Sequence, residues 1–202
     1  MKASAKVSGV VPQIAVVTGV CAGCAAMIAA MADVVIASEG SELFLTAPFN
    51  NADGKLEGAG SAANAAKSGV CQILAKDADE AVAKAKKLVS ILPENNLGVG
   101  YNDAAPEDDA VVSAAMKGAD IAATVAQKGS IIEFGEKFGK AAYTALGAVN
   151  GNTVAFVATD KAEKLTSADC AKIARFVQFA DVFSIPVVTI VNTEGFEGSS
   201  AA

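Results

Sequence analysis

The chain has 202 residues, of which 52% are hydrophobic and 19% are charged, with 18 Gly and 5 Pro. This length and composition fit one large or two small folded domains, and they exclude a disordered chain, collagen and a disulfide-rich miniprotein. Sixteen basic against 22 acidic residues leave a net charge of −6 without a basic run, so we expect no nucleic-acid partner.

Two residue types narrow the possible chemistry further. The sequence contains no histidine, which removes Ser-His-Asp and Cys-His catalysis and every imidazole metal ligand. Its four cysteines are too few for a dense disulfide framework in a chain of this length. They therefore favour a reducing, cytoplasmic location.

The N-terminal region is apolar enough to imitate a targeting segment. Lys2 and Lys6 precede an apolar stretch at 10–20, and Cys24 follows it, as in a lipoprotein signal. However, Pro12 interrupts the stretch, and the residues after Cys24 are apolar instead of forming a polar tether. Glycines also lie where a strand would turn into a helix. We therefore predict a buried strand, turn and helix, with no direct membrane insertion.

Strand and helix patterns alternate from there to residue 92. Short β-branched or apolar runs predict strands at 14–18, 33–37, 42–46 and 70–74. Runs of small or amphipathic residues predict helices at 22–31, 58–67 and 77–92, the first of them buried. The last is the clearest, because acidic residues occupy its first turn and one apolar stripe follows it. That stripe consists of Ala78, Val82, Ala85, Val89 and Leu92.

The second half follows a segment rich in Asn, Gly, Pro and acidic residues, which predicts a linker at 98–109. We then predict a helix at 110–127, a short segment at 130–134 and a hairpin of strands 142–149 and 154–159, joined by Asn150-Gly151-Asn152. A helix at 166–183 and a buried strand at 185–191 complete the pattern. Because each half has few strands, we predict an α/β chain of two partial domains, 1–97 and 110–202.

The segment 19–27 carries the candidate chemistry. A glycine-bearing turn between a strand and a helix leaves unpaired backbone N–H groups at the positive end of the helix dipole, where a negatively charged oxygen can bind. Alternatively, the turn only packs the helix on the strand. Cys21 and Cys24 form a C-x-x-C, but a zinc site would need Cys71 and Cys170 too, and a thioredoxin-like pair lacks the surrounding βαβ context. We therefore expect no metal.

Short motifs occur in a fixed order along almost the whole chain. They lie at 9–14, 19–23, 32–35, 43–48, 68–70 and 88–96 in the first half, and at 130–134, 138–139, 149–152, 172–181, 183–186, 188–189 and 195–196 in the second. Together they resemble the carboxyltransferase subunits of biotin-dependent acyl-CoA carboxylases and decarboxylases, of the propionyl-CoA carboxylase beta and methylmalonyl-CoA decarboxylase alpha type. That family belongs to the crotonase superfamily.

The resemblance implies a crotonase-like fold of repeated ββα units. Residues 1–97 would be the later part of an N-type domain, and residues 110–202 the early part of a C-type domain. The implied activity, as part of a complex, moves CO₂ between carboxybiotin and the α-carbon of a short acyl-CoA. The enolate formed would be held by backbone N–H groups, which the family pattern puts at Gly23 and Cys24. This mechanism takes no general base from a side chain, so it is compatible with a chain that lacks histidine.

The resemblance also implies the remaining contacts and partners. The acyl-CoA would contact Cys21, Ala22, Thr46, Ala47 and Pro48, and the biotin side would contain Gly195 and Phe196. Biotin would arrive on a biotin carboxyl carrier protein, without a metal. We expect the chain to form a homo-oligomer or to pair with a complementary carboxyltransferase chain.

Four positions depart from the family pattern. Cys24 replaces a glycine, Asn64 and Gln72 each replace a histidine, and Glu194 replaces a proline. These departures leave open a non-catalytic structural subunit, or a fragment, that pairs with a carboxyltransferase paralogue. A crotonase-type hydratase or isomerase is a second alternative, but it needs a carboxylate on the helix after the turn, where Met27 stands.

Arg175 is the only arginine in the sequence. It lies in the predicted helix at 166–183, whose other residues nearby are mostly apolar. Two interpretations stay open: a solvated or interdomain ion pair, and a contact with the phosphates of CoA.

Overall fold

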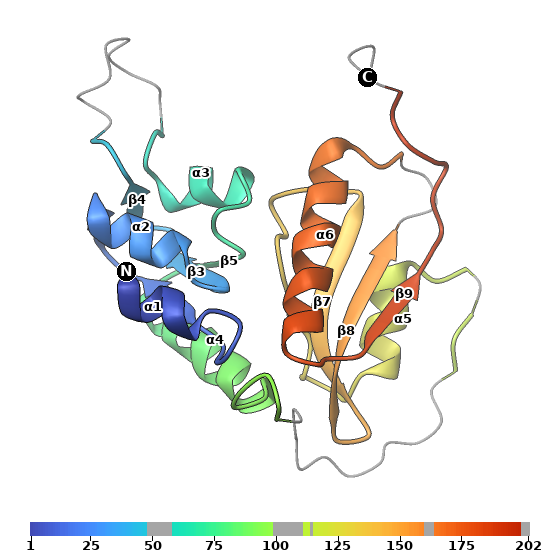
Figure 1. The fold of residues 1–202 in the computed structure, drawn as a ribbon. Coiled ribbons are helices and arrows are strands. Elements are labelled where there is room, and N and C mark those ends of the chain that lie inside the picture. Colours follow the sequence, from blue (N-terminus) through green and yellow to red (C-terminus); the bar gives the residue numbers. More distant parts are fainter. Residues whose placement is uncertain (48–57, 99–110, 114, 160–163, 199–202) are drawn as a thin grey trace.

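Two α/β halves lie side by side in the computed structural model of the chain (Figure 1). The structure describes residues 1–47, 58–98, 111–113, 115–159 and 164–198, so most of the predicted linker lies outside the described residues. Within this part of the chain, no helix is both long and apolar enough to span a membrane.

The N-terminal half is built on a parallel sheet of three strands. Its order is β1 (Ile14–Val17), β3 (Val34–Ser38) and β5 (Ile73–Ala75), and all five residues of the central strand β3 are buried. Beside this sheet, β2 (Val20–Ala22) pairs in parallel with β4 (Glu42–Phe44). The helices of this half are α1 (Lys2–Val7), α2 (Cys24–Ala30), α3 (Ala62–Lys67) and α4 (Ala78–Ile91).

The C-terminal half contains a four-stranded sheet in the order β6 (Ile132–Glu133), β7 (Ala142–Val149), β8 (Asn152–Thr159) and β9 (Val187–Ile190). Helix α5 (Gly118–Val125) packs on β7 and β8, and α6 (Ser167–Val182) makes the crossover from β8 to the parallel strand β9. Asn150 and Gly151 have φ angles of 48° and 78°, as a tight type I′ hairpin turn requires. The predicted hairpin is confirmed.

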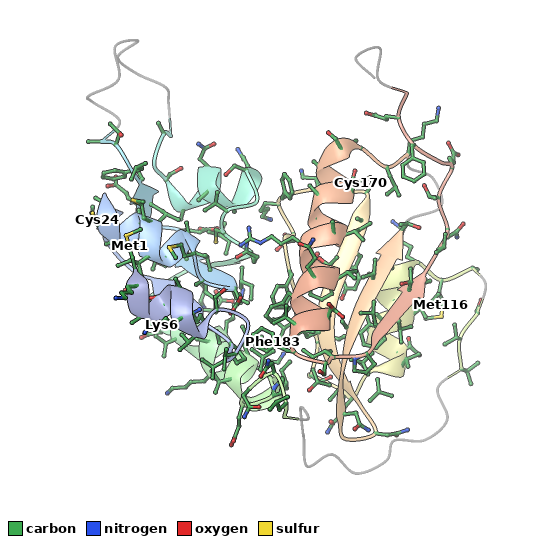
Figure 2. All side chains as sticks on the ribbon, viewed as in Figure 1. Met1, Lys6, Cys24, Met116, Cys170 and Phe183 are labelled. Atoms are coloured by element: carbon green, nitrogen blue, oxygen red, sulfur yellow. The ribbon has the colours of Figure 1, made fainter. Side chains whose placement is uncertain are left out.

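One hydrophobic core is shared by the two halves. Its buried side chains come from β3, β5 and α4 on one side and from β6, β7, β8 and α6 on the other, and they include Ile36, Leu88, Leu146, Phe176 and Phe183. Phe183 accordingly lies between the halves in Figure 2. Hydrogen bonds also cross from one half to the other: the Gly135 amide donates to the Gln72 carbonyl at 2.7 Å, and the Lys87 ammonium donates to the Ile131 carbonyl at 2.8 Å. The halves therefore pack as one unit.

The predicted helix at 77–92 is found as α4, but its apolar stripe is only partly buried: Leu92 lies in the core and Ala85 packs against it. Val82 and Val89 are 43% and 63% exposed, and Ala78 is also exposed, whereas the buried residues are Ala81, Leu88 and Ile91. Both stripes have helical spacing, so periodicity alone does not choose between them. The buried face also holds the stems of two lysines, Lys84 and Lys87, whose ammonium groups reach the carbonyls of Leu74 and Ile131.

The structure corrects three further predictions, two on burial and one on the length of a helix. The predicted buried helix at 22–31 exposes Met27, Ile28 and Met31, because α2 uses only the small side chains Ala26 and Ala29 to pack on the core. The predicted buried strand at 185–191 is an exposed edge, because β9 pairs only with β8 in the described sheet. The helix predicted at 110–127 is confined to α5, since residues 111–113 and 115–117 are not helical.

A buried carboxylate fixes the start of α6. Asp169 is 1% exposed, and one of its oxygens accepts hydrogen bonds from the amides of Ala141 and Ala142 at 2.9 and 3.1 Å. The other oxygen accepts from the Thr166 amide and hydroxyl, which completes a capping box. Burial by itself raises the pKa of Asp169, but the hydrogen bonds from Thr166, Ala142 and Ala141 together outweigh it and lower the pKa.

We expect Asp169→Asn to lower the free energy of unfolding at pH 7 by about 3 kcal/mol, because an amide must place its NH₂ group against N–H donors. Since the folded pKa of Asp169 is depressed, its stabilising contribution is present above the unfolded pKa and is lost as the pH falls through the folded value, below about pH 4. Urea unfolding at several pH values should therefore show the two proteins converging in acid.

Asp181→Asn is the matched control, because Asp181 is an exposed residue of the same helix. It should change the free energy of unfolding little at any pH. Equal stabilities of the wild type and Asp169→Asn at pH 7 would contradict the role assigned to this carboxylate.

Candidate functional site

The turn between β2 and α2 is held in place by the pairing of β2 with β4. Ala22 lies opposite Phe44 in that ladder, and the Gly23 amide donates to the Phe44 carbonyl at 3.0 Å. Gly23 has a φ of 59° and a ψ of −129°, a backbone conformation that favours glycine. The strand pairing and this glycine together direct the chain into α2.

Helix α2 presents backbone donors at this turn. Its first helical hydrogen bond runs from the Met27 amide to the Gly23 carbonyl at 3.1 Å. The amides of Cys24, Ala25 and Ala26 precede that bond, and in the described part of the chain no protein acceptor is recorded for them. They lie at the positive end of the short helix dipole, where an anionic oxygen is stabilised.

The two predicted oxyanion donors therefore differ in this structure. The Cys24 amide has no acceptor among the described residues, whereas the Gly23 amide donates to the Phe44 carbonyl. The Gly23 amide could donate to an oxyanion only if its hydrogen bond to Phe44 were broken. The sequence motif does not reveal this difference, because the pairing of β2 with β4 joins residues about 20 positions apart.

An apolar groove of about 510 Å³ adjoins the turn. β1, β2 and α2 line it, with Val16, Val20, Cys21, Ala25 and Ile28 among its side chains. Cys21 is half-buried and Cys24 is exposed, and both thiols are free. Figure 2 shows Cys24 at the outer side of the N-terminal half. In the described ranges, no group of His, Cys, Asp and Glu side chains could hold a metal ion.

Of the other residues predicted to contact the acyl-CoA, Ala22 lies on β2, and Thr46 and Ala47 lie in the segment after β4. Ala22 is the last residue of β2, and Leu45 separates Thr46 from Phe44, the last residue of β4. Pro48 lies outside the described residues. The strand pairing thus joins 20–23 to 42–44, the residues just before Thr46 and Ala47.

The predicted biotin side lies elsewhere. Gly195 and Phe196 follow β9, where the Leu165 amide donates to the Gly195 carbonyl at 2.9 Å and Leu165 bridges to Phe196. The Gly195 amide donates to the Thr193 hydroxyl at 3.2 Å, while the Phe196 ring is 70% exposed. Figure 1 shows this C-terminal segment at the outer side of one half and α2 at the outer side of the other. One chain therefore does not bring the two predicted subsites together.

The structure shows the contacts of two residues that depart from the family pattern, Gln72 and Asn64. The Gln72 side chain accepts from the Val35 amide at 2.8 Å and donates to the carbonyls of Gly69 and Val70 at 2.9 and 3.0 Å. Asn64 is exposed on α3, and its backbone amide donates a hydrogen bond to the Ser61 hydroxyl. Gln72 therefore joins β3 to the turn before β5, and neither residue lines the groove beside Cys24.

Arg175 makes a hydrogen bond between the halves instead of the ion pair considered above. Its Nη1 donates to the Gly69 carbonyl at 3.2 Å. Among the described residues, no carboxylate lies within 4.0 Å of its guanidinium group.

Comparison with known proteins gives matches along the whole chain. The carboxyl transferase domain family matches residues 1–202. The chain is 36% identical to the methylmalonyl-CoA carboxyltransferase 12S subunit of Propionibacterium freudenreichii and 31% identical to the propionyl-CoA carboxylase beta chain of Saccharopolyspora erythraea. Each alignment covers 96% of this chain and 41% of the relative. The chain thus spans about two fifths of the length of these curated relatives.

The structure is also similar to a solved one, the transcarboxylase 12S hexamer with methylmalonyl-CoA and methylmalonic acid bound. The TM-score is 0.88 at 31% identity, covering 99% of this chain and 43% of that chain. These matches confirm the family resemblance and the crotonase-like α/β fold class expected from the sequence.

Proposed function

Because the chain belongs to the carboxyl transferase domain family, we propose that it forms part of a biotin-dependent carboxyltransferase acting on a short acyl-CoA. The observation that carries this proposal is the unpaired Cys24 amide at the start of α2, next to an apolar groove. The names of the relatives, which include methylmalonyl-CoA carboxyltransferase and propionyl-CoA carboxylase, support short acyl groups as the substrate class.

The chemistry that this turn can perform is stabilisation of an enolate. When the bond between the α-carbon and the carboxyl group breaks, its electron pair moves toward the thioester oxygen. The Cys24 amide, with the neighbouring amides of α2, would donate hydrogen bonds to that oxygen as its negative charge develops. Gly23 would shape the turn through its positive φ and its hydrogen bond to Phe44. No step needs a side-chain base, which agrees with a chain that lacks histidine.

The substrate would lie along the strands that form the turn. We place the acyl-CoA against Cys21, Ala22, Thr46 and Ala47, with Pro48 following in the sequence, and its apolar portion in the groove between β1 and α2. The biotin side would use Gly195 and Phe196. The Phe196 ring is exposed, and the Phe196 backbone amide has no acceptor in the described part of the chain. These two groups fit the flat ureido ring of biotin. When bound on its carrier protein, biotin would supply or accept the carboxyl group.

The positions of the two subsites favour a site completed by another chain. Because α2 and the segment after β9 lie on opposite outer sides, we place the turn of one copy against the biotin side of another copy or of a complementary carboxyltransferase chain. Exposed valines on β9, together with Val20 and Phe196, provide apolar surface for such contacts.

Two alternatives make different use of the same fold. A structural subunit without catalysis is favoured by Asn64 and Glu194, which depart from the family pattern. A hydratase or isomerase is disfavoured, because α2 carries no carboxylate and exposes Met27 instead.

The proposed function predicts a specific order of activity among Cys24 variants. Cys24→Ala and Cys24→Gly keep the amide, so most carboxyl transfer should remain in the active assembly. Cys24→Pro removes the N–H at the first helical position, where proline is compatible with the fold, and it should lower the rate about 10²- to 10³-fold. The assay follows carboxyl transfer to or from methylmalonyl-CoA, with melting temperatures as the control for folding.

Either of two results would argue against the proposed function. A well-folded but inactive Cys24→Ala protein would assign the chemistry to the thiol. An undiminished rate in Cys24→Pro would remove the amide from the mechanism.

A site shared between copies predicts complementation between two inactive variants. Cys24→Pro disables the turn, and Gly195→Val disables the biotin side, because a φ of 115° does not suit valine. When equal amounts are mixed and allowed to exchange subunits, about a quarter of the sites in a twofold dimer should regain both intact parts. Activity in the mixture is compared with each variant alone; a mixture as inactive as its components would contradict the shared site.

A further inference from the structure

A cavity of about 220 Å³ lies between the two halves of the chain, separate from the groove beside the α2 turn. Residues before β3 and between α3 and β5 line it from the N-terminal half. From the C-terminal half it is lined by β7, by α6 and by the segment between β6 and β7. The function proposed above does not use this cavity.

One wall of the cavity is aromatic. Phe134, Phe176 and Phe179 are all buried, and the ring centroids of Phe176 and Phe179 lie 5.2 and 6.0 Å from that of Phe134. Phe138 packs on Gly69 so closely that a Cβ atom at Gly69 would lie 2.9 Å from its ring. This wall suits a flat apolar group, because aromatic rings pack well against each other at such distances.

The cavity lining also includes polar groups, among them a guanidinium group with spare donors. Arg175 is exposed, and its recorded hydrogen bond to the Gly69 carbonyl uses one of its five N–H donors. As described above, it has no carboxylate within hydrogen-bonding distance. Asp33 also lines the cavity, but its carboxylate accepts from the Gln13 amide at 2.8 Å. Lys172 lines it as well, and donates to the carbonyls of Ala142 and Gly139 at 2.7 and 3.3 Å.

We infer that this cavity binds a small aromatic carboxylate, with the ring against Phe134 and Phe176 and the carboxylate on Arg175. The volume is sufficient, since an apolar cavity of about 150 Å³ holds benzene, which leaves space for one carboxylate group. The cavity is lined by two cationic side chains, Arg175 and Lys172, and by one carboxylate, that of Asp33, so it favours an anion over a cation. Arginine is suited to a carboxylate, because its planar donors can form paired charge-assisted hydrogen bonds.

The test is a calorimetric titration of the chain with benzoate. We expect saturable binding of one molecule per chain, tighter than the binding of acetate, which lacks the ring, or of benzyl alcohol, which lacks the charge. Arg175→Gln should weaken benzoate binding about tenfold or more, because the charge-assisted hydrogen bonds are lost. Asp33→Asn should strengthen it about threefold, because a like charge beside the ligand is removed.

Two further variants make the result specific to the cavity. Ala171→Phe places a large side chain at an exposed position that lines the cavity, and it should abolish binding. Lys86→Gln removes an exposed positive charge of α4 outside the cavity, and it should leave binding unchanged. Melting temperatures without ligand show whether each variant is folded. Absence of saturable benzoate binding, equal binding by Arg175→Gln and Lys86→Gln, or full binding by Ala171→Phe would overturn the inference.

Discussion

The hydrophobic core shared by the two halves determines which surfaces of the chain remain for chemistry. It buries the inner strand β3 of one sheet and the hairpin of β7 and β8 of the other, with α4 and α6 between them. Because these faces are used for packing, the β2–α2 turn and the segment after β9 lie on opposite outer sides (Figure 1). The separation of the two proposed subsites follows from how the chain is packed, and it is the reason that we propose a site completed by a second chain.

Within the N-terminal half, the hydrogen bond from Gly23 to Phe44 gives Gly23 and Cys24 different roles. The Gly23 amide is held by the Phe44 carbonyl, so Gly23 sets the direction of the chain, and the first amide without an acceptor among the described residues is that of Cys24. In the proposed function a main-chain donor would tolerate a change of side chain, which would explain how Cys24 can replace the glycine expected from the family resemblance. The thiol then needs no chemical role, and its exposure is compatible with this reading.

Local signals in the sequence predicted most of the elements, whereas the buried faces depended on distant contacts. Asn150-Gly151 predicted the hairpin, and Thr166 or Ser167 predicted the start of α6, because turn and cap geometry depend on adjacent residues. The buried face of α4 was not predictable in this way. Its exposed valines and its buried Ala81, Leu88 and Ile91 both repeat with helical spacing, and packing against β1 and β3 selects between them.

In the candidate site, too, the local motif was predictable from the sequence, whereas the contacts between distant residues were not. The glycine turn and its helix could be recognised from 19–27, but the engagement of Gly23 depends on the register of β2 against β4. Likewise, the sequence did not indicate that Gln72 joins β3 to the chain before β5, or that Arg175 reaches the Gly69 carbonyl more than 100 residues away. The family resemblance supplied the residues of the site, and the structure supplied which backbone groups are free.

The most direct measurement of the central claim is the amide NMR spectrum of the ¹⁵N-labelled chain in its active assembly, titrated with an acyl-CoA analogue that bears a stable enolate-like anion. A hydrogen bond to an anionic oxygen moves an amide proton downfield. The account predicts that the Cys24 amide proton moves downfield on saturation, while the Gly23 amide proton, held by Phe44, keeps its position. A shift of Gly23 without one of Cys24, or no shift of either at saturation, would contradict it.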